Sequence, residues 1–119
     1  MLLPRDRPPY EAFKQTLAHL KAEASQSSVD QSALKTGLAQ LQQLFQNQIL
    51  SSEANSSDQP DDQRVQSYQV EINKQLRLLS TDLTFLQAAR KTATAQQRQD
   101  QIRDRLTLLM TYCDALLET

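Results

Sequence analysis

The residues best equipped for chemistry form a cationic stretch toward the C-terminal end of the chain. Five Arg and Lys side chains occur within 16 residues there, and two Asp residues lie among them. Arginine donates paired hydrogen bonds to carboxylates and phosphates, so such a stretch is typical of a docking surface. The competing interpretation is a solvated helix face, whose surface ion pairs each stabilise the fold very little. The partner-binding candidates are Arg90, Arg98, Arg103 and Arg105.

The chain has few side chains that could perform catalysis or bind a metal. The chain holds one His, one Cys and one Gly, whereas a Cys and His zinc site needs more ligands and a phosphate-binding loop needs several glycines. Asp82 lies near the apolar stripe of a predicted helix, where a buried acid is more often paired with an arginine such as Arg105 than catalytic. A lone acid without a nucleophile or metal partner performs no reaction. We therefore expect a protein that is not an enzyme, with no catalytic residues, no cofactor and no metal.

The composition predicts an all-α fold. The chain contains 18 Gln and 19 Leu, and both residue types are good helix formers. The single Gly and the absence of Trp argue against an all-β fold, which needs turn glycines and strand aromatics. The 13 basic and 14 acidic residues give a net charge of -1, whereas nucleic-acid-binding domains are usually strongly basic. We therefore do not expect a nucleic acid as partner.

The apolar segments of the chain also bear on its location. No apolar run approaches the roughly 20 residues of a membrane-spanning helix. The N-terminal sequence MLLPRDRPP lacks the long apolar stretch and cleavage site of a signal peptide. We expect a cytoplasmic protein with no membrane insertion.

Four segments show the 3- and 4-residue apolar spacing of amphipathic helices. The first begins near Pro8, the second after a cap at Ser28 or Asp30, the third at Pro60, and the fourth after a capping box at Thr94. The stripes are Tyr10, Phe13, Leu17, Leu20 and Ala24; Leu34, Leu38, Leu41, Phe45 and either Gln48 or Ile49; Val65, Tyr68, Ile72, Leu76, Leu79, Leu83 and Leu86; and Ile102, Leu106, Leu109, Cys113 and Leu116.

These segments predict one all-α domain over residues 1–119, with an antiparallel four-helix bundle-like arrangement and a long third helix. We expect residues 1–7 to be a flexible N-terminus. Residues 51–61 are poor in apolar side chains and read as a linker between the second and third helices.

The third predicted helix has a second apolar face. Leu78 and Phe85 lie well away from its main stripe at about 100° per residue, at positions where a helix buried on one side would carry charge. Three interpretations stay open. The first two helices cover this face as part of the bundle, a second subunit covers it in a homodimer, or a different partner binds it.

The C-terminal half of the chain resembles a known family. The segments SYQVEINKQLRLL (67–79), DLTFLQAAR (82–90), TAQQR (94–98), DRL (104–106) and YC (112–113) together look like PatD, the cyanobacterial heterocyst frequency control family. The resemblance is best over residues 65–117. The N-terminal half is similar only in being helical and rich in Gln and Leu.

This resemblance implies a small, non-enzymatic, all-α cytoplasmic protein. PatD-like proteins are associated with the division protein FtsZ, affect its assembly into filaments, and influence heterocyst frequency in filamentous cyanobacteria. The expected function is then that of a cell-division accessory protein whose partner is FtsZ. The alternative is a helical dimeric adaptor or structural protein with a different protein partner.

Two assignments of the surface follow from this expectation. In the first, the four arginines dock on FtsZ, whose surfaces are generally acidic, while Leu78 and Phe85 hold the bundle or a dimer together. A dimer would present the arginines twice and could join neighbouring filaments by avidity. In the second assignment, Leu78 and Phe85 form the partner surface and the arginines are idle.

Overall fold

The protein is an all-α bundle of four packed helices. The computed structural model describes residues 7–26, 29–49 and 60–118. A π-helical turn, η2, extends the second helix by five residues. The elements are α1 (Arg7–Ala24), α2 (Gln31–Leu44), η2 (Phe45–Ile49), α3 (Pro60–Ala88) and α4 (Thr92–Leu117).

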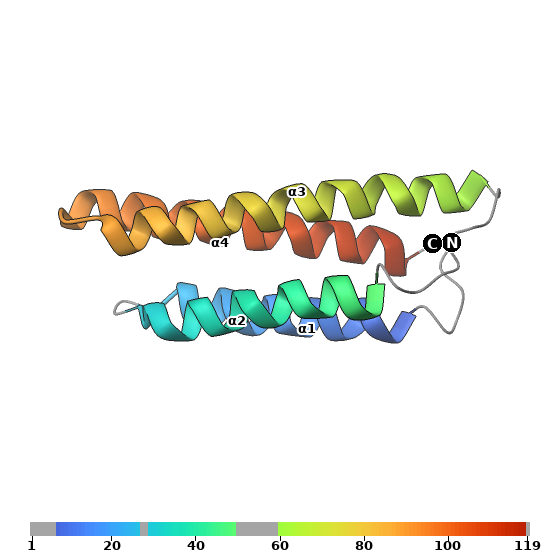
Figure 1. Ribbon diagram of the computed structural model, residues 1–119, viewed down its shortest axis with the longest axis horizontal. Helices are drawn as coiled ribbons and strands as arrows, with labels where there is room; N and C mark the ends of the chain where they lie inside the picture. The colour runs from blue at the N-terminus through green and yellow to red at the C-terminus, as the bar shows by residue number, and fades with distance from the viewer. Residues whose placement is uncertain (1–6, 27–28, 50–59, 119) are drawn as a thin grey trace.

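The helices form two antiparallel hairpins that lie against each other (Figure 1). Helix α1 packs on α2 and α4, and α3 packs on α2 and α4, so each helix has two neighbours. Helices α3 and α4 are the longest, with 29 and 26 residues. The turn that joins them extends beyond the turn between α1 and α2 (Figure 1). The α3–α4 turn is therefore the free end of the bundle.

The predicted apolar stripes form the core. Every stripe residue of α1 and α4 is buried, as are Leu34, Leu38, Leu41, Phe45 and Ile49 of α2 with η2 and the five from Ile72 to Leu86 in α3. Gln48, the alternative to Ile49, is exposed. Val65 and Tyr68 are partly buried and pack against this core. The Phe13 and Phe45 rings meet at 6.2 Å between centroids, which joins α1 to η2. The 3- and 4-residue spacing thus identified the buried face of all four helices.

Three of the four helix starts agree with the sequence, and one differs. Asp30 caps α2 by accepting hydrogen bonds from the backbone N–H groups of Ser32 and Ala33, and α3 begins at Pro60 as expected. The predicted capping box at Thr94 is wrong, because α4 already begins at Thr92, with Lys91 as an N-cap that makes no side-chain cap bond. Ser28, the other cap candidate for α2, lies outside the described residues.

The predicted flexible N-terminus is wrong at Arg7. Arg7 opens α1 and donates a hydrogen bond of 2.8 Å to the carbonyl of Leu117, at the last turn of α4. This bond satisfies a carbonyl that the end of α4 leaves free. Residues 1–6, and residues 51–59 of the predicted linker, lie outside the described part of the chain. The predicted end of the linker at residue 61 is wrong, because Pro60 and Asp61 open α3.

Polar contacts also hold α1 against α4 along its length. Gln99 donates hydrogen bonds to the carbonyls of Ala24 and Gln26 at 2.7 and 3.0 Å, and so caps the C-terminal end of α1. Lys14 forms an ion pair with Asp114, and the hydrogen bond to that carboxylate raises the pKa of Lys14. These contacts set the α1–α2 hairpin in register with α4.

The only glycine marks a close approach of α1 and α2. A Cβ atom on Gly37 would lie 2.5 Å from Cδ1 of Leu20, much closer than real Cβ atoms come to their neighbours. On the outer side of this crossing lies an open cleft of about 350 Å³ lined by polar residues that include Thr16, His19 and Gln40. His19 is exposed there, on the side of α1 away from the core stripe.

Cys113 makes the stability of the fold sensitive to alkaline pH. Its side chain is fully buried, and loss of hydration raises the pKa of the thiol from 9.0 to about 12. Above pH 9 the unfolded chain therefore loses a proton that the folded chain retains, so stability falls as pH rises toward 12. We expect a loss of up to about 1.4 kcal/mol per pH unit in this window.

Urea denaturation at a series of pH values above and below 9.0 measures this slope. Cys113→Ala is the control, because it lacks the thiol and keeps every Tyr and Lys that also titrates at high pH. Equal slopes for the two proteins would contradict the assignment to Cys113.

Candidate protein-binding surface

A buried polar cluster joins α3 to α4 near the free end of the bundle. Asp82 is 3% exposed, and its carboxylate accepts a hydrogen bond from Nε of Arg105. Arg105 also donates from Nη1 to Oε1 of Gln75, at 3.1 Å. The sequence-based expectation that a buried Asp82 would pair with Arg105 is confirmed. Because its guanidinium is held inside the hairpin, Arg105 acts as a structural residue and is not free for docking.

Arg98 connects this cluster to the surface. Its guanidinium lies 3.8 Å from the Asp82 carboxylate and covers the Phe85 ring, with 4.4 Å between the guanidinium carbon and the ring centroid. A guanidinium over an aromatic face at this distance is a favourable cation–π contact. Arg98 and Phe85 were predicted in separate candidate sites, whereas the structure brings them into one.

The remaining candidate arginines do not join Arg98 in a single cluster. Arg103 lies five residues further along α4, about 140° around the helix, and pairs with Asp100 on the same helix. Arg90 is exposed in the turn formed by residues 89–91. The four arginines therefore have three different environments: a buried network, an aromatic contact and the solvent-exposed surface.

The second face of α3 stays open to solvent. Three large apolar side chains of the described residues are exposed, Val70 by 67%, Phe85 by 48% and Leu108 by 37%, and all three belong to the α3–α4 hairpin. Leu78 on the same face of α3 is half-buried. The interpretation that the first two helices cover this face is wrong, because α2 packs on the opposite, core-facing side of α3. A homodimer and a different partner remain as the two interpretations.

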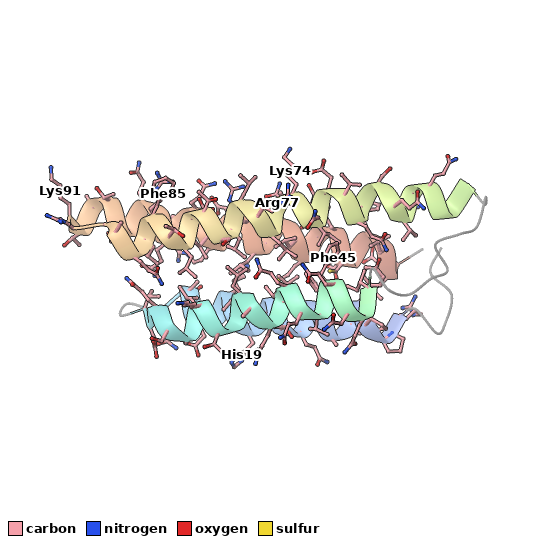
Figure 2. All side chains as sticks on the ribbon, in the orientation of Figure 1. His19, Phe45, Lys74, Arg77, Phe85 and Lys91 are labelled. Atoms are coloured by element: carbon pink, nitrogen blue, oxygen red, sulfur yellow. The ribbon has the colours of Figure 1, made fainter. Side chains whose placement is uncertain are left out.

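Two further cations belong to this face. At about 100° per residue, Val70, Lys74, Arg77, Leu78 and Phe85 fall within an arc of about 100°, opposite the core stripe. Figure 2 shows Lys74, Arg77 and Phe85 following one another along α3, with His19 on the opposite side of the bundle. Lys74 and Arg77 are not among the predicted site residues, because they lie far from the other cations along the chain and share a face with Phe85 only around the helix.

The charge along this face from Lys74 onward is positive, and Glu71, about one turn before Lys74, lies at its N-terminal edge. From residue 73 to residue 99 the chain has five cations and one acid, and that acid is the buried Asp82. The whole chain has a net charge of -1, so its surface charge is unevenly distributed. We call the exposed cations and the apolar residues among them the Phe85 surface. It comprises Lys74, Arg77, Leu78, Phe85, Arg90, Lys91 and Arg98.

This arrangement has the chemistry of a recognition surface. Exposed guanidinium and ammonium groups favour carboxylates, and a half-exposed ring offers an apolar anchor for a partner side chain. Within the described residues no group of three His, Cys, Asp or Glu side chains could hold a metal ion. No helix among them is both long and apolar enough to cross a membrane.

Comparison of the chain with protein-family models, curated proteins and solved structures finds no match.

Proposed function

We propose that this chain is a non-enzymatic, cytoplasmic cell-division accessory protein that binds FtsZ and modulates its assembly into filaments. In a filamentous cyanobacterium this activity would influence how often heterocysts form. The partner is suggested by the resemblance of residues 65–117 to the PatD family. The mode of binding is suggested by the Phe85 surface.

The observation that carries this proposal is the half-exposed Phe85 ring beneath the Arg98 guanidinium. Lys91 lies at the α3–α4 turn, the free end of the bundle (Figure 2), and Arg90 precedes it in the same turn, five residues after Phe85. An exposed apolar group ringed by cations fits an acidic protein surface, because the charges attract the partner and the ring contributes the buried contact. Arg105 keeps a positioning role through Asp82.

Joining neighbouring filaments needs more than one contact per particle. A dimer would present the Phe85 surface twice, and such two-fold presentation joins neighbouring filaments by avidity. A symmetric dimer formed through the Phe85 surface itself would bring its own cations together. Like-charge repulsion therefore argues for a dimer contact elsewhere on the bundle.

Co-sedimentation with FtsZ and GTP tests the proposal. We expect the protein to pellet with FtsZ polymer and to change the polymer yield, with weaker binding as salt rises. The double variant Arg90→Glu and Lys91→Glu should reduce the affinity at least about tenfold, because it reverses two exposed charges of the Phe85 surface.

Lys35→Glu is the matched control for this experiment. Lys35 is an exposed cation of α2, in the hairpin that does not carry the Phe85 surface, so its reversal should leave binding unchanged. If the wild-type protein stays in the supernatant at every ratio and FtsZ polymerises normally, FtsZ is not the partner.

A further inference from the structure

The Phe85 surface has a linear layout along α3. Lys74 and Arg77 lie at one end, Arg90 and Lys91 lie at the other, and the apolar residues lie between them. Helix α3 continues for 14 residues from Lys74 to its end at Ala88, which corresponds to about 21 Å along the helix axis, and Arg90 and Lys91 lie in the turn just beyond it. A partner that matches this pattern carries acids at both ends of an apolar centre.

The apolar centre has the spacing of a helix-packing face. Leu78 and Phe85 are seven residues apart, so they lie two turns apart on the same side of α3. A second helix lying along α3 meets both residues with its own side chains at i and i+7. An extended strand has a different side-chain period and would not match this repeat.

We propose that the Phe85 surface binds an acidic amphipathic helix of about five turns supplied by another protein. The helix lies along the outer face of α3, its apolar side chains contact Leu78 and Phe85, and its Asp and Glu residues pair with the flanking cations. This inference deepens the proposed function, and rests on it only for the identity of the partner.

Charge decides between this occupant and a second copy of the chain. In a two-fold dimer the same patch lies on both subunits, so the five cations between residues 73 and 99 would face five more. The one acid in that stretch is buried and already paired with Arg105, so it cannot neutralise them. The carboxylates of an acidic helix would instead attract these cations and so favour binding.

Arg98 adds selectivity for a carboxylate beside the ring. It makes a long ion pair of 3.8 Å with Asp82, whose other oxygen is bound by Arg105. Its side chain is 39% exposed, so it can accept a second carboxylate from the solvent side while it stays over Phe85. A partner helix with a carboxylate next to the apolar residue that contacts Phe85 would therefore bind best.

The test uses labelled synthetic peptides of about 18 residues and fluorescence anisotropy. One panel has Leu at i and i+7 with Glu at the flanking positions, and the matched panel has the same Leu residues with Lys in place of Glu. We expect the acidic panel to bind, to gain helicity by circular dichroism on binding, and to weaken as salt rises. The basic panel should not bind.

Variants of the protein locate the site. Phe85→Ala and the double variant Lys74→Glu and Arg77→Glu should each weaken the acidic peptides at least about tenfold. Phe85→Tyr keeps the ring and should restore binding. Lys35→Glu on α2 should have no effect, and an equal loss with that variant would show that the attraction is unspecific and overturn the inference.

Two further results would overturn it. One is binding of acidic and basic peptides with equal affinity, or of neither. The other is a homodimer at micromolar concentration that Phe85→Ala dissociates, which would make a second copy the occupant.

If acidic peptides bind but FtsZ does not co-sediment, the proposed function fails and this inference stands. If FtsZ co-sediments and no acidic peptide binds, this inference fails alone.

Discussion

Replacing Arg105 by Met is expected to lower the free energy of unfolding by about 3 kcal/mol. The variant leaves the carboxylate of Asp82, which is 3% exposed, without its hydrogen-bond donor, and it also removes the donor to Gln75. Arg98 at 3.8 Å cannot fully replace the lost contact, because its guanidinium is held over the Phe85 ring. Urea denaturation followed by circular dichroism measures the loss.

Arg103→Met provides a matched control for this measurement. It makes the same change two residues away on α4, but the partner of Arg103 is the exposed Asp100. Exposed ion pairs contribute at most about 1 kcal/mol, so this variant should remain close to wild type. Equal losses for the two variants would mean that burial of Asp82 does not determine the stability of the hairpin.

A second comparison tests whether stability requires the two charges themselves or only that neither charge is left without its partner. Asp82→Leu combined with Arg105→Met replaces both charges by apolar side chains of similar size. Replacing a whole buried ion pair in this way is often neutral or stabilising, whereas removal of one partner is costly. The double variant should therefore regain most of the stability that Arg105→Met loses.

The core of this protein was predictable because it depends on one local property. Leu17, Leu41 and Leu106 are buried for the same reason, namely that they repeat at 3- and 4-residue intervals along a helix that must hide one side. The Asp82–Arg105 pair was predictable on similar grounds. An acid beside an apolar stripe needs a cation, and α4 offers one on the facing side.

The contacts that align the hairpins were not predictable. Arg7 reaches Leu117 across 110 residues of sequence, and Gln99 reaches Ala24 across 75. Each contact uses a polar side chain that has no periodic pattern around it, so nothing local distinguishes it from the many other Gln and Arg side chains. Such contacts depend on the distance between helix ends, which only the assembled bundle determines.

The candidate site was predictable in its residue types but not in its grouping. Counting charge along the chain joined Arg98 with Arg103, although these residues point to different sides of α4. The same count omitted Lys74 and Arg77, which share a face with Phe85. A helical-wheel plot of the charged residues of α3 would have identified that face. The contact between Arg98 and Phe85 crosses from one helix to another and required the structure.

The buried Phe45 and the half-exposed Phe85 should differ strongly in how much stability their truncation costs. Phe45 is 1% exposed and packs against the Phe13 ring, so Phe45→Ala should cost about 3 to 5 kcal/mol of unfolding free energy. Phe85 is 48% exposed, and Phe85→Ala should change stability by less than about 1 kcal/mol. Urea denaturation of both variants, with Phe45→Leu as a milder core change, measures these values.

Binding should show the reverse order. Phe85→Ala removes the apolar centre of the Phe85 surface and should weaken co-sedimentation with FtsZ at least about tenfold, whereas folded Phe45→Leu should bind like wild type. A large stability loss from Phe85→Ala in the monomeric chain would instead make Phe85 a core residue, because a ring truncated at the surface leaves no cavity behind. Full binding by stable Phe85→Ala would leave only the cations as the docking groups. The paired measurements thus determine whether this ring holds the fold or meets the partner.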